Sequence, residues 1–263
     1  MTGRVRLDNL LAERGLFPSR TKAAAAVMAG EVRIDGSPAG TPGQLVSEDL
    51  ELEIAERPRY VSRGGTKLER ALELTGVDPE GLLCLDVGAS TGGFTDCLLQ
   101  RGAAGVACVD VGYGELAWEL RTDPRVTVIE RTNARHLDPD DLPFRPGLVV
   151  ADCSFISLTK ILPAVLASAA PRYDALVMVK PQFELGKGRV GSGGVVRDPG
   201  ERAEAVLGVA SFAQEQCGAA VLGFAPSGLP GPKGNRETFI HLAEEGRPGA
   251  LDDLAATVAE VEL

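Results

Sequence analysis

The sequence predicts an α/β fold, with an open, mostly parallel sheet of six or seven strands over residues 66–263 and a small α+β domain over residues 1–57. Two observations support the larger domain. A glycine-rich turn joins an apolar run to a helical segment in LLCLDVGASTGGFTD, residues 82–96, and short apolar runs then alternate with helical segments. A third observation separates the two domains: residues 58–65 hold a proline, two arginines and two glycines, which indicates a basic linker.

The first 57 residues read as two helices followed by short strands. Apolar residues at helical spacing predict one amphipathic helix in RVRLDNLLAERGL, ending at Gly15. Ser19 is expected to cap a second helix that stops at Gly30. The segment EVRIDG alternates and turns at Asp35 and Gly36, which predicts a hairpin, and LVSEDLELEI completes a small sheet.

The pattern RLDxLLxxRGLxxSRxxA followed by GxVRIDG closely resembles the α-L RNA-binding domain first described in a ribosomal small-subunit protein. The resemblance implies an RNA-facing set of basic residues: Arg4, Arg6, Arg14, Arg20, Lys22 and Arg33. The linker adds Arg59 and Arg63, and beside them Tyr60 suits stacking on an RNA base. The alternative is a helical hairpin and a linker whose charges are merely solvated. After the linker, Thr66 is expected to cap the first helix of the larger domain.

The glycine-rich turn is the strongest local signal for a nucleotide site. Asp86 follows a buried strand and precedes the first glycine, where a carboxylate would repel a pyrophosphate but suit a cationic ligand such as S-adenosylmethionine. A tight turn without a ligand is the alternative. The residues predicted to contact the cofactor here are Asp86, Gly88, Ser90, Thr91, Gly92, Gly93 and Phe94, the last beginning the helix.

A second carboxylate strengthens this interpretation. Asp110 ends the next apolar strand, 24 residues after Asp86, where Rossmann-like sheets place the residue that binds both ribose hydroxyls of an adenosine. Asn133 follows a third strand and suits contact with the adenine edge, although a simple turn residue explains it equally well. Asp152, at the end of a fourth strand, is counted with the cofactor site as well.

The remaining strands complete the sheet. Apolar runs at 82–87, 105–111, 126–130, 147–152, 175–180 and about 220–225 are predicted strands, and ETFIHLAE forms a last one. Because that last strand follows the GPKGN turn directly, we expect it to be antiparallel. This is the Rossmann-like architecture of S-adenosylmethionine-dependent methyltransferases, and residues 246–263 are expected to form a C-terminal helix.

The composition limits the classes of protein to which the chain can belong. With 44% hydrophobic and 24% charged residues and no apolar run long enough to span a bilayer or serve as a secretory signal, the chain reads as a cytoplasmic globular protein, expected to be a monomer. Five scattered cysteines and two histidines without ligand spacing predict no metal site. The net charge of −10 is unusual for a nucleic-acid-binding protein.

Four charged residues fall where active sites of such sheets lie, beyond the carboxyl ends of the strands. They are Lys67, at the start of the first helix, Asp152, Lys180, which ends ALVMVK, and Glu237, which opens the last strand. An amine among apolar neighbours could take a proton from a sugar hydroxyl, with the carboxylates orienting it. The sequence lacks the D/N-P-P-Y/F motif of base-amine methylation and any cysteine preceding a proline, so the acceptor is expected to be a hydroxyl.

The motifs LDVGASTGGFTD, VDVGYGELAW, IERTNAR, VVADCSFISL, VKPQFELGKG and GPKGNRE together resemble the TlyA family. These are two-domain bacterial ribosomal RNA ribose 2′-O-methyltransferases, also labelled haemolysins, with an FtsJ-like catalytic domain. The resemblance implies S-adenosylmethionine as cofactor, cytidines of ribosomal RNA in the ribosomal subunits as substrates, and a catalytic tetrad of Lys67, Asp152, Lys180 and Glu237. Two alternatives stay open: a small-molecule hydroxyl as acceptor, which the acidic charge favours, and a membrane-active haemolysin.

Overall fold

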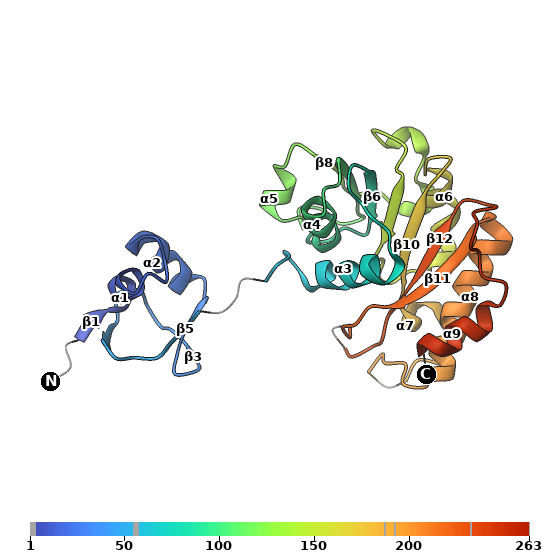
Figure 1. Ribbon diagram of the computed structural model, residues 1–263. Coiled ribbons are helices and arrows are strands. Elements are labelled where there is room, and N and C mark those ends of the chain that lie inside the picture. Colours follow the sequence, from blue (N-terminus) through green and yellow to red (C-terminus); the bar gives the residue numbers. More distant parts are fainter. Residues whose placement is uncertain (1–3, 55–57, 187, 192, 232, 263) are drawn as a thin grey trace. The chain divides into compact units, whose positions relative to one another are not determined.

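The computed structural model describes residues 4–54, 58–186, 188–191, 193–231 and 233–262. The chain divides into two compact units, Met1–Pro58 and Arg59–Leu263, each with its own hydrophobic core (Figure 1).

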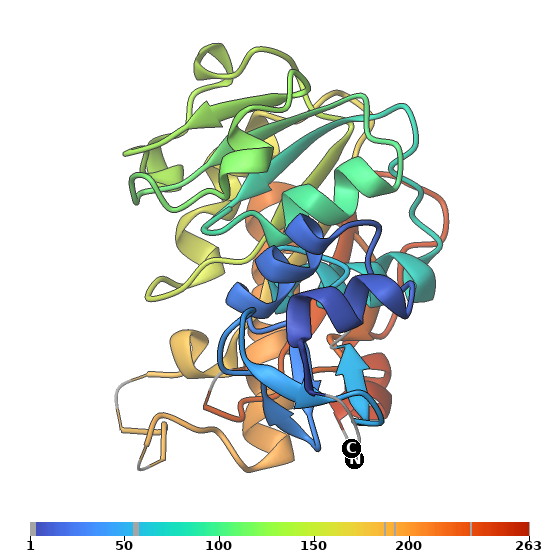
Figure 2. The same cartoon turned by 90° about the vertical axis from the view of Figure 1, so that its left-hand side faces the viewer.

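Among the residues that the structure describes, the small unit has two helices and five short strands, and in Figure 2 the helices lie above the strands. As predicted, Ser19 caps the second helix by accepting the backbone N–H of Lys22, and Asp35 and Gly36 turn the hairpin with φ of 48° and 77°. Positive φ at both positions is the backbone of a type I′ turn. The elements are β1 (Arg4–Arg6), α1 (Leu7–Glu13), α2 (Arg20–Met28), β2 (Val32–Ile34), β3 (Ser37–Pro38), β4 (Leu45–Ser47) and β5 (Leu52–Ile54).

Two expectations for this unit are wrong. The predicted first helix starts at Leu7, because Arg4–Arg6 form strand β1, which pairs antiparallel with β4. The short strands also make two sheets, β1-β4 and β3-β2-β5, where one was expected. Strands β4 and β5, contiguous in LVSEDLELEI, pair with different partners, which a local pattern does not specify.

The first helix of the large unit, α3 (Arg63–Thr75), begins earlier than predicted. Ser62, in place of Thr66, is the capping residue and accepts the N–H of Gly64 at 3.3 Å. Glycine at position 65 is required by packing, since a Cβ there would lie 2.2 Å from Cγ of Tyr60. The two glycines that indicate a linker therefore lie in the helix, and Gly65 permits close contact within its first turn.

The large unit is built on a seven-stranded sheet with the order β11-β12-β10-β9-β6-β7-β8. Strands β6 to β10 run parallel, and β12 is antiparallel to both of its neighbours, β10 and β11, which confirms the predicted last strand. The strands are β6 (Leu83–Val87), β7 (Gly105–Val109), β8 (Val126–Ile129), β9 (Leu148–Ala151), β10 (Asp174–Val179), β11 (Ala220–Pro226) and β12 (Thr238–Ala243).

Helices cover both faces of this sheet, because the central strands are apolar on both sides. In β9, Leu148 and Val150 pack toward α3 and α4, whereas Val149 and Ala151 pack toward α6 and α8. The remaining helices are α4 (Gly93–Gln100), α5 (Trp118–Arg121), α6 (Leu162–Ala167), α7 (Pro181–Glu184), α8 (Pro199–Cys217) and α9 (Leu254–Glu262), with the 3-10 helices η1 (Ala134–His136), η2 (Pro139–Asp141) and η3 (Leu158–Lys160).

The C-terminal helix is shorter than expected. It spans Leu254–Glu262 because Pro248 and Gly249, the latter with φ of 92°, fall in the first half of the predicted stretch. Within the described residues, no helix is both long and apolar enough to cross a membrane.

Candidate active site

A cavity of about 600 Å³ opens at the carboxyl ends of β6, β7, β8 and β9. Gly88, at the end of β6, is part of its wall. A Cβ at this position would lie 2.7 Å from the backbone oxygen of Asp152, and φ is +82°. The glycine therefore brings β6 and β9 close together and leaves room where a side chain would stand.

Asp110 presents its carboxylate to this cavity in a fixed orientation. Its Oδ2 accepts the N–H of Ser90 at 2.8 Å, and its Oδ1 accepts the N–H of Gly112 at 2.7 Å. Ser90 adopts φ of 48°, and its hydroxyl donates to Glu115 at 3.2 Å. Glu115 also lines the cavity and was missed at the sequence level, because nothing in VGYGELAW marks it except its distance from Asp110.

Asp86 has a different position from the one expected. It lies within β6, fully buried, and its Oδ2 accepts the N–H and hydroxyl of Thr95 at 3.0 and 2.7 Å. Burial raises the pKa of its carboxyl to about 7, opposed by the Thr95 hydrogen bonds, and Oδ1 is buried with no hydrogen-bond partner among the residues that the structure describes. Asp86 therefore holds the start of α4 and does not line the cavity.

The rest of the glycine turn shapes the backbone. Gly92, with φ of 96°, packs against Leu120, where a Cβ would lie at 2.3 Å, and Phe94 packs on Phe239 at a ring distance of 5.8 Å. Thr91, Gly92, Gly93 and Phe94 all lie outside the cavity lining, so their predicted cofactor contacts stay predictions. Asn133 lines the cavity and also caps η1 by accepting the N–H of Arg135 at 3.1 Å.

Lys180 follows β10 and forms one of two lysine–carboxylate pairs. Its Nζ lies 2.5 Å from Oδ1 of Asp152 and 2.9 Å from Oγ of Ser154. The side chains of Lys180 and Asp152 are 11% and 25% exposed, so the pair reaches solvent, and Asp152 also borders the cavity.

The second pair is buried. Nζ of Lys67, on the first turns of α3, donates to Glu237, and the two side chains are 7% and 2% exposed. The β10–β12 register ends at Val179 opposite Thr238, so Lys180, just after β10, and Glu237, just before the antiparallel β12, lie at the same end of neighbouring strands. All four predicted tetrad residues therefore meet at one edge of the sheet, as two ion pairs.

The loop after β9 is held beside this edge by α7. Glu184 accepts the hydroxyl of Ser157 at 2.5 Å and the N–H of Leu158 at 2.9 Å. Phe155 packs on Phe183 at 5.2 Å, yet it is 90% exposed and has φ of 64°. A bulky residue in this conformation is uncommon, so the surrounding loop must impose it.

The predicted RNA-facing residues of the small unit are all exposed, and four of them, Arg6, Arg14, Arg20 and Arg33, have side chains bonded to nearby acceptors. Arg6 and Arg20 both pair with Asp8, at 2.8 and 3.0 Å, and the guanidinium of Arg6 first, then Arg20, lowers the pKa of that carboxyl to about 2. Arg14 donates to the carbonyl of Leu50 at 2.8 Å. Arg4, Lys22 and Arg33 are exposed, the last donating to Gly36.

Of the two arginines assigned to the linker by the sequence, Arg59 pairs with Glu69, and Arg63, the first residue of α3, donates to the carbonyl of Pro230, both within the large unit. The stacking role expected for Tyr60 is wrong. Its ring is 3% exposed and packs on Gly65, which leaves no face for a base. Among the described residues, no group of three or more histidine, cysteine, aspartate and glutamate side chains could hold a metal ion.

This sheet, with its cavity and charged edge, defines a Rossmann-like methyltransferase joined to a small α+β unit of the RNA-binding type. Residues 60–244 match the FtsJ-like methyltransferase family and residues 5–52 match the S4 domain. The chain is 54% identical to the 16S/23S rRNA (cytidine-2′-O)-methyltransferase TlyA of Mycobacterium tuberculosis, over 92% of this chain and 91% of that protein. It belongs to the TlyA family.

Two further relatives carry a different label. Hemolysin A of Brachyspira hyodysenteriae is 38% identical over 90% of this chain and 99% of its own length. A solved structure of a candidate hemolysin from Streptococcus thermophilus superimposes with a TM-score of 0.73 at 38% identity, over 99% of this chain and 96% of that one.

Proposed function

We propose that this protein transfers a methyl group from S-adenosylmethionine to the ribose 2′-hydroxyl of a cytidine in ribosomal RNA. The observation that carries the proposal is the Lys180 amine, held by Asp152 and Ser154 at the rim of the 600 Å³ cavity. A lysine so placed is a proton acceptor for a hydroxyl, not a recognition element for a base amine.

The cavity fits the proposed cofactor. Its volume is in the range of ligand sites, and the missing side chain of Gly88 and the oriented carboxylate of Asp110 suit an adenosine and its ribose hydroxyls. We assign Gly88, Ser90, Asp110 and Asn133 to holding it. When bound, S-adenosylmethionine supplies an activated methyl group on a sulfonium.

The protein's own residues then position the acceptor. In its unprotonated form, Nζ of Lys180 accepts the proton of the 2′-hydroxyl and so becomes the ammonium that pairs with Asp152, which also fixes its direction. The buried Lys67–Glu237 pair anchors α3 to the start of β12, next to Lys180. This anchoring keeps rigid the part of the site that receives the ribose hydroxyl.

Features of both units support an RNA substrate. The small unit belongs to the S4 domain class, and its exposed Arg4, Arg6, Arg20 and Lys22 suit phosphate contacts. On the large unit, the exposed ring of Phe155 at the cavity suits stacking on a base taken out of its helix. The names of the relatives from M. tuberculosis and Campylobacter jejuni, both rRNA (cytidine-2′-O)-methyltransferases, agree with this class of acceptor.

The test is methyl transfer from labelled S-adenosylmethionine to unmethylated ribosomal subunits, compared with free nucleosides and small alcohols. We expect label in ribosomal RNA, recovered as 2′-O-methylcytidine after digestion, and none with the Lys180→Ala variant. If only the small molecules became labelled, the acceptor would be a small-molecule hydroxyl and not RNA. Lysis of erythrocytes by the purified protein, without methyl transfer, would favour the haemolysin interpretation suggested by the name of the Brachyspira relative.

A further inference from the structure

A second cavity, of about 500 Å³, lies between the segment that leads into α8 and the loop that leads into β12. Its walls contain four cationic side chains: Arg197, Arg202, Lys233 and Arg236. A concentration of positive charge is unexpected in a chain with a net charge of −10. Neither the predicted tetrad nor the predicted cofactor residues include any of the four.

Three of the four positive charges in this cavity have no carboxylate partner among the residues that the structure describes. Arg202 forms a buried ion pair with Glu262, in which Nε of Arg202 donates to Oε2 of Glu262 at 2.8 Å. The other three cations are exposed, and none forms an ion pair with any residue that the structure describes. Asp198 is the neighbouring carboxylate, and it is engaged in capping α8 by accepting the N–H of Glu201 at 2.9 Å. The cavity therefore retains an excess of positive charge.

The walls of the cavity are fixed to each other. Asn235 is 2% exposed; its Oδ1 accepts the N–H of Val196 at 2.9 Å, and its Nδ2 donates to the carbonyl of Gly194 at 2.8 Å. A Cβ on Gly194 would lie 3.7 Å from Nζ of Lys233, so the lysine amine extends across to the opposite segment. This bracing presents the cations as a formed site, which lowers the entropic cost of binding an anion.

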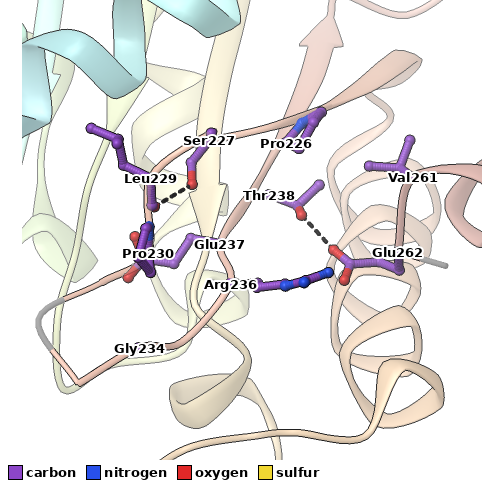
Figure 3. A pocket seen from close by; sticks show the side chains of 11 residues that line it. Pro226, Ser227, Leu229, Pro230, Gly234, Arg236, Glu237, Thr238, Val261 and Glu262 are labelled. Atoms are coloured by element: carbon purple, nitrogen blue, oxygen red, sulfur yellow. Dashed lines mark hydrogen bonds between the residues drawn. The ribbon is translucent and has the colours of Figure 1, made fainter.

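The cavity adjoins the catalytic edge. Arg236 and Gly234 also line a neighbouring cavity of about 430 Å³ whose wall includes Glu237 of the buried ion pair. Figure 3 shows this neighbouring cavity, with Arg236 and Glu237, consecutive in sequence, extending to different sides of the loop. A ligand of the basic cavity would thus bind close to the acceptor side of the active site.

We infer that the basic cavity binds a backbone phosphate of the RNA strand that carries the target nucleotide, through Arg197, Lys233 and Arg236. This inference rests on the proposed function. Guanidinium and ammonium groups with free donors are the side chains that recognise phosphate, and a phosphate held here would fix the register of the strand relative to Lys180. The site contributes affinity and alignment, not base specificity.

The experiment compares the full-length protein with Arg236→Ala and Lys233→Ala, and with Arg172→Ala as the matched control. Arg172 is an exposed arginine just before β10, at the opposite, amino-terminal end of the parallel strands. Binding to purified unmethylated ribosomal subunits is measured over a range of salt concentrations, together with calorimetric binding of S-adenosylmethionine. Arg236→Lys retains the charge and serves as the conservative rescue.

Each alanine variant in the cavity should weaken subunit binding about tenfold and reduce the slope of log affinity against log salt by about one unit. Affinity for S-adenosylmethionine should be unchanged, and Arg172→Ala should resemble wild type. If wild type methylates subunits but the cavity variants behave like Arg172→Ala, the phosphate site is refuted while the proposed function stands. If wild type methylates neither subunit, the proposed function fails and this inference fails with it.

Discussion

The edge of the sheet proposed to be catalytic has two sets of charged residues that differ in their access to solvent. Lys67, Glu237 and Asp86 are buried, whereas Lys180, Asp152 and Asp110 border the cavity or reach solvent. The difference separates two functions. A buried charge must be paired or neutralised for the fold to be stable, so the first set acts on stability. The second set remains free to meet a ligand, so we expect substitutions there to change rate and affinity.

The largest effect is expected where a buried pair loses one partner. Lys67→Met leaves Glu237 buried and unpaired, which should lower the free energy of unfolding by about 3–5 kcal/mol in urea denaturation. The matched control is the double variant Lys67→Met with Glu237→Leu, which removes both charges and should recover most of the lost stability. Full methylation by a stable double variant would refute a role of this pair in the reaction.

Lys180→Ala addresses the exposed pair. Because Nζ of Lys180 contacts Asp152 and Ser154 near solvent, its loss should cost little stability but lower the methylation rate by about 10²-fold or more. Single-turnover methylation of ribosomal subunits measures the rate, and calorimetry should show nearly unchanged binding of S-adenosylmethionine. A variant that keeps more than about a tenth of the wild-type rate would contradict proton transfer by this lysine.

Asp110→Ala tests the aspartate that faces the 600 Å³ cavity, where we propose that the cofactor binds. Loss of its charged hydrogen bonds should weaken S-adenosylmethionine binding by about 1–2 kcal/mol in calorimetry. Since the carboxylate also accepts the N–H groups of Ser90 and Gly112, Asp110→Asn is the control that retains one acceptor for the turn. Equal affinity in wild type and Asp110→Ala would remove this residue from the cofactor site.

Asp86→Asn tests the buried aspartate and should give the smallest effect, visible as a change in pH dependence. The folded-state pKa of about 7 lies above the unfolded value near 3.9, so this group's contribution is present at low pH and is lost as pH rises through 7. Between pH 6 and pH 8 the free energy of unfolding of the wild type should therefore fall by about 1 kcal/mol relative to that of Asp86→Asn. Parallel stability curves for the two proteins over this range would show that the carboxyl does not titrate there.

Local pattern in the sequence predicts much of this arrangement. Apolar runs bounded by glycine and charged residues mark the strands, and a turn leading directly into the last strand forces it to be antiparallel. Because parallel strands end at one edge, the positions of Asp110, Asp152 and Lys180 at strand ends suffice to bring them to the same side of the sheet. Helix caps such as Ser19 are equally local and were found.

Contacts between distant segments were decided only by the tertiary structure. Lys67 and Glu237 are 170 residues apart, and their pairing depends on how α3 packs on the sheet against β11. Asp86 and Tyr60 read as exposed in their local segments, yet the packing of α4 and of Gly65 buries them. Asn235 fixes the basic cavity through Val196 and Gly194 on another segment. A local pattern encodes the periodicity of each element, whereas burial and pairing depend on strand order and on the segments that the fold brings together.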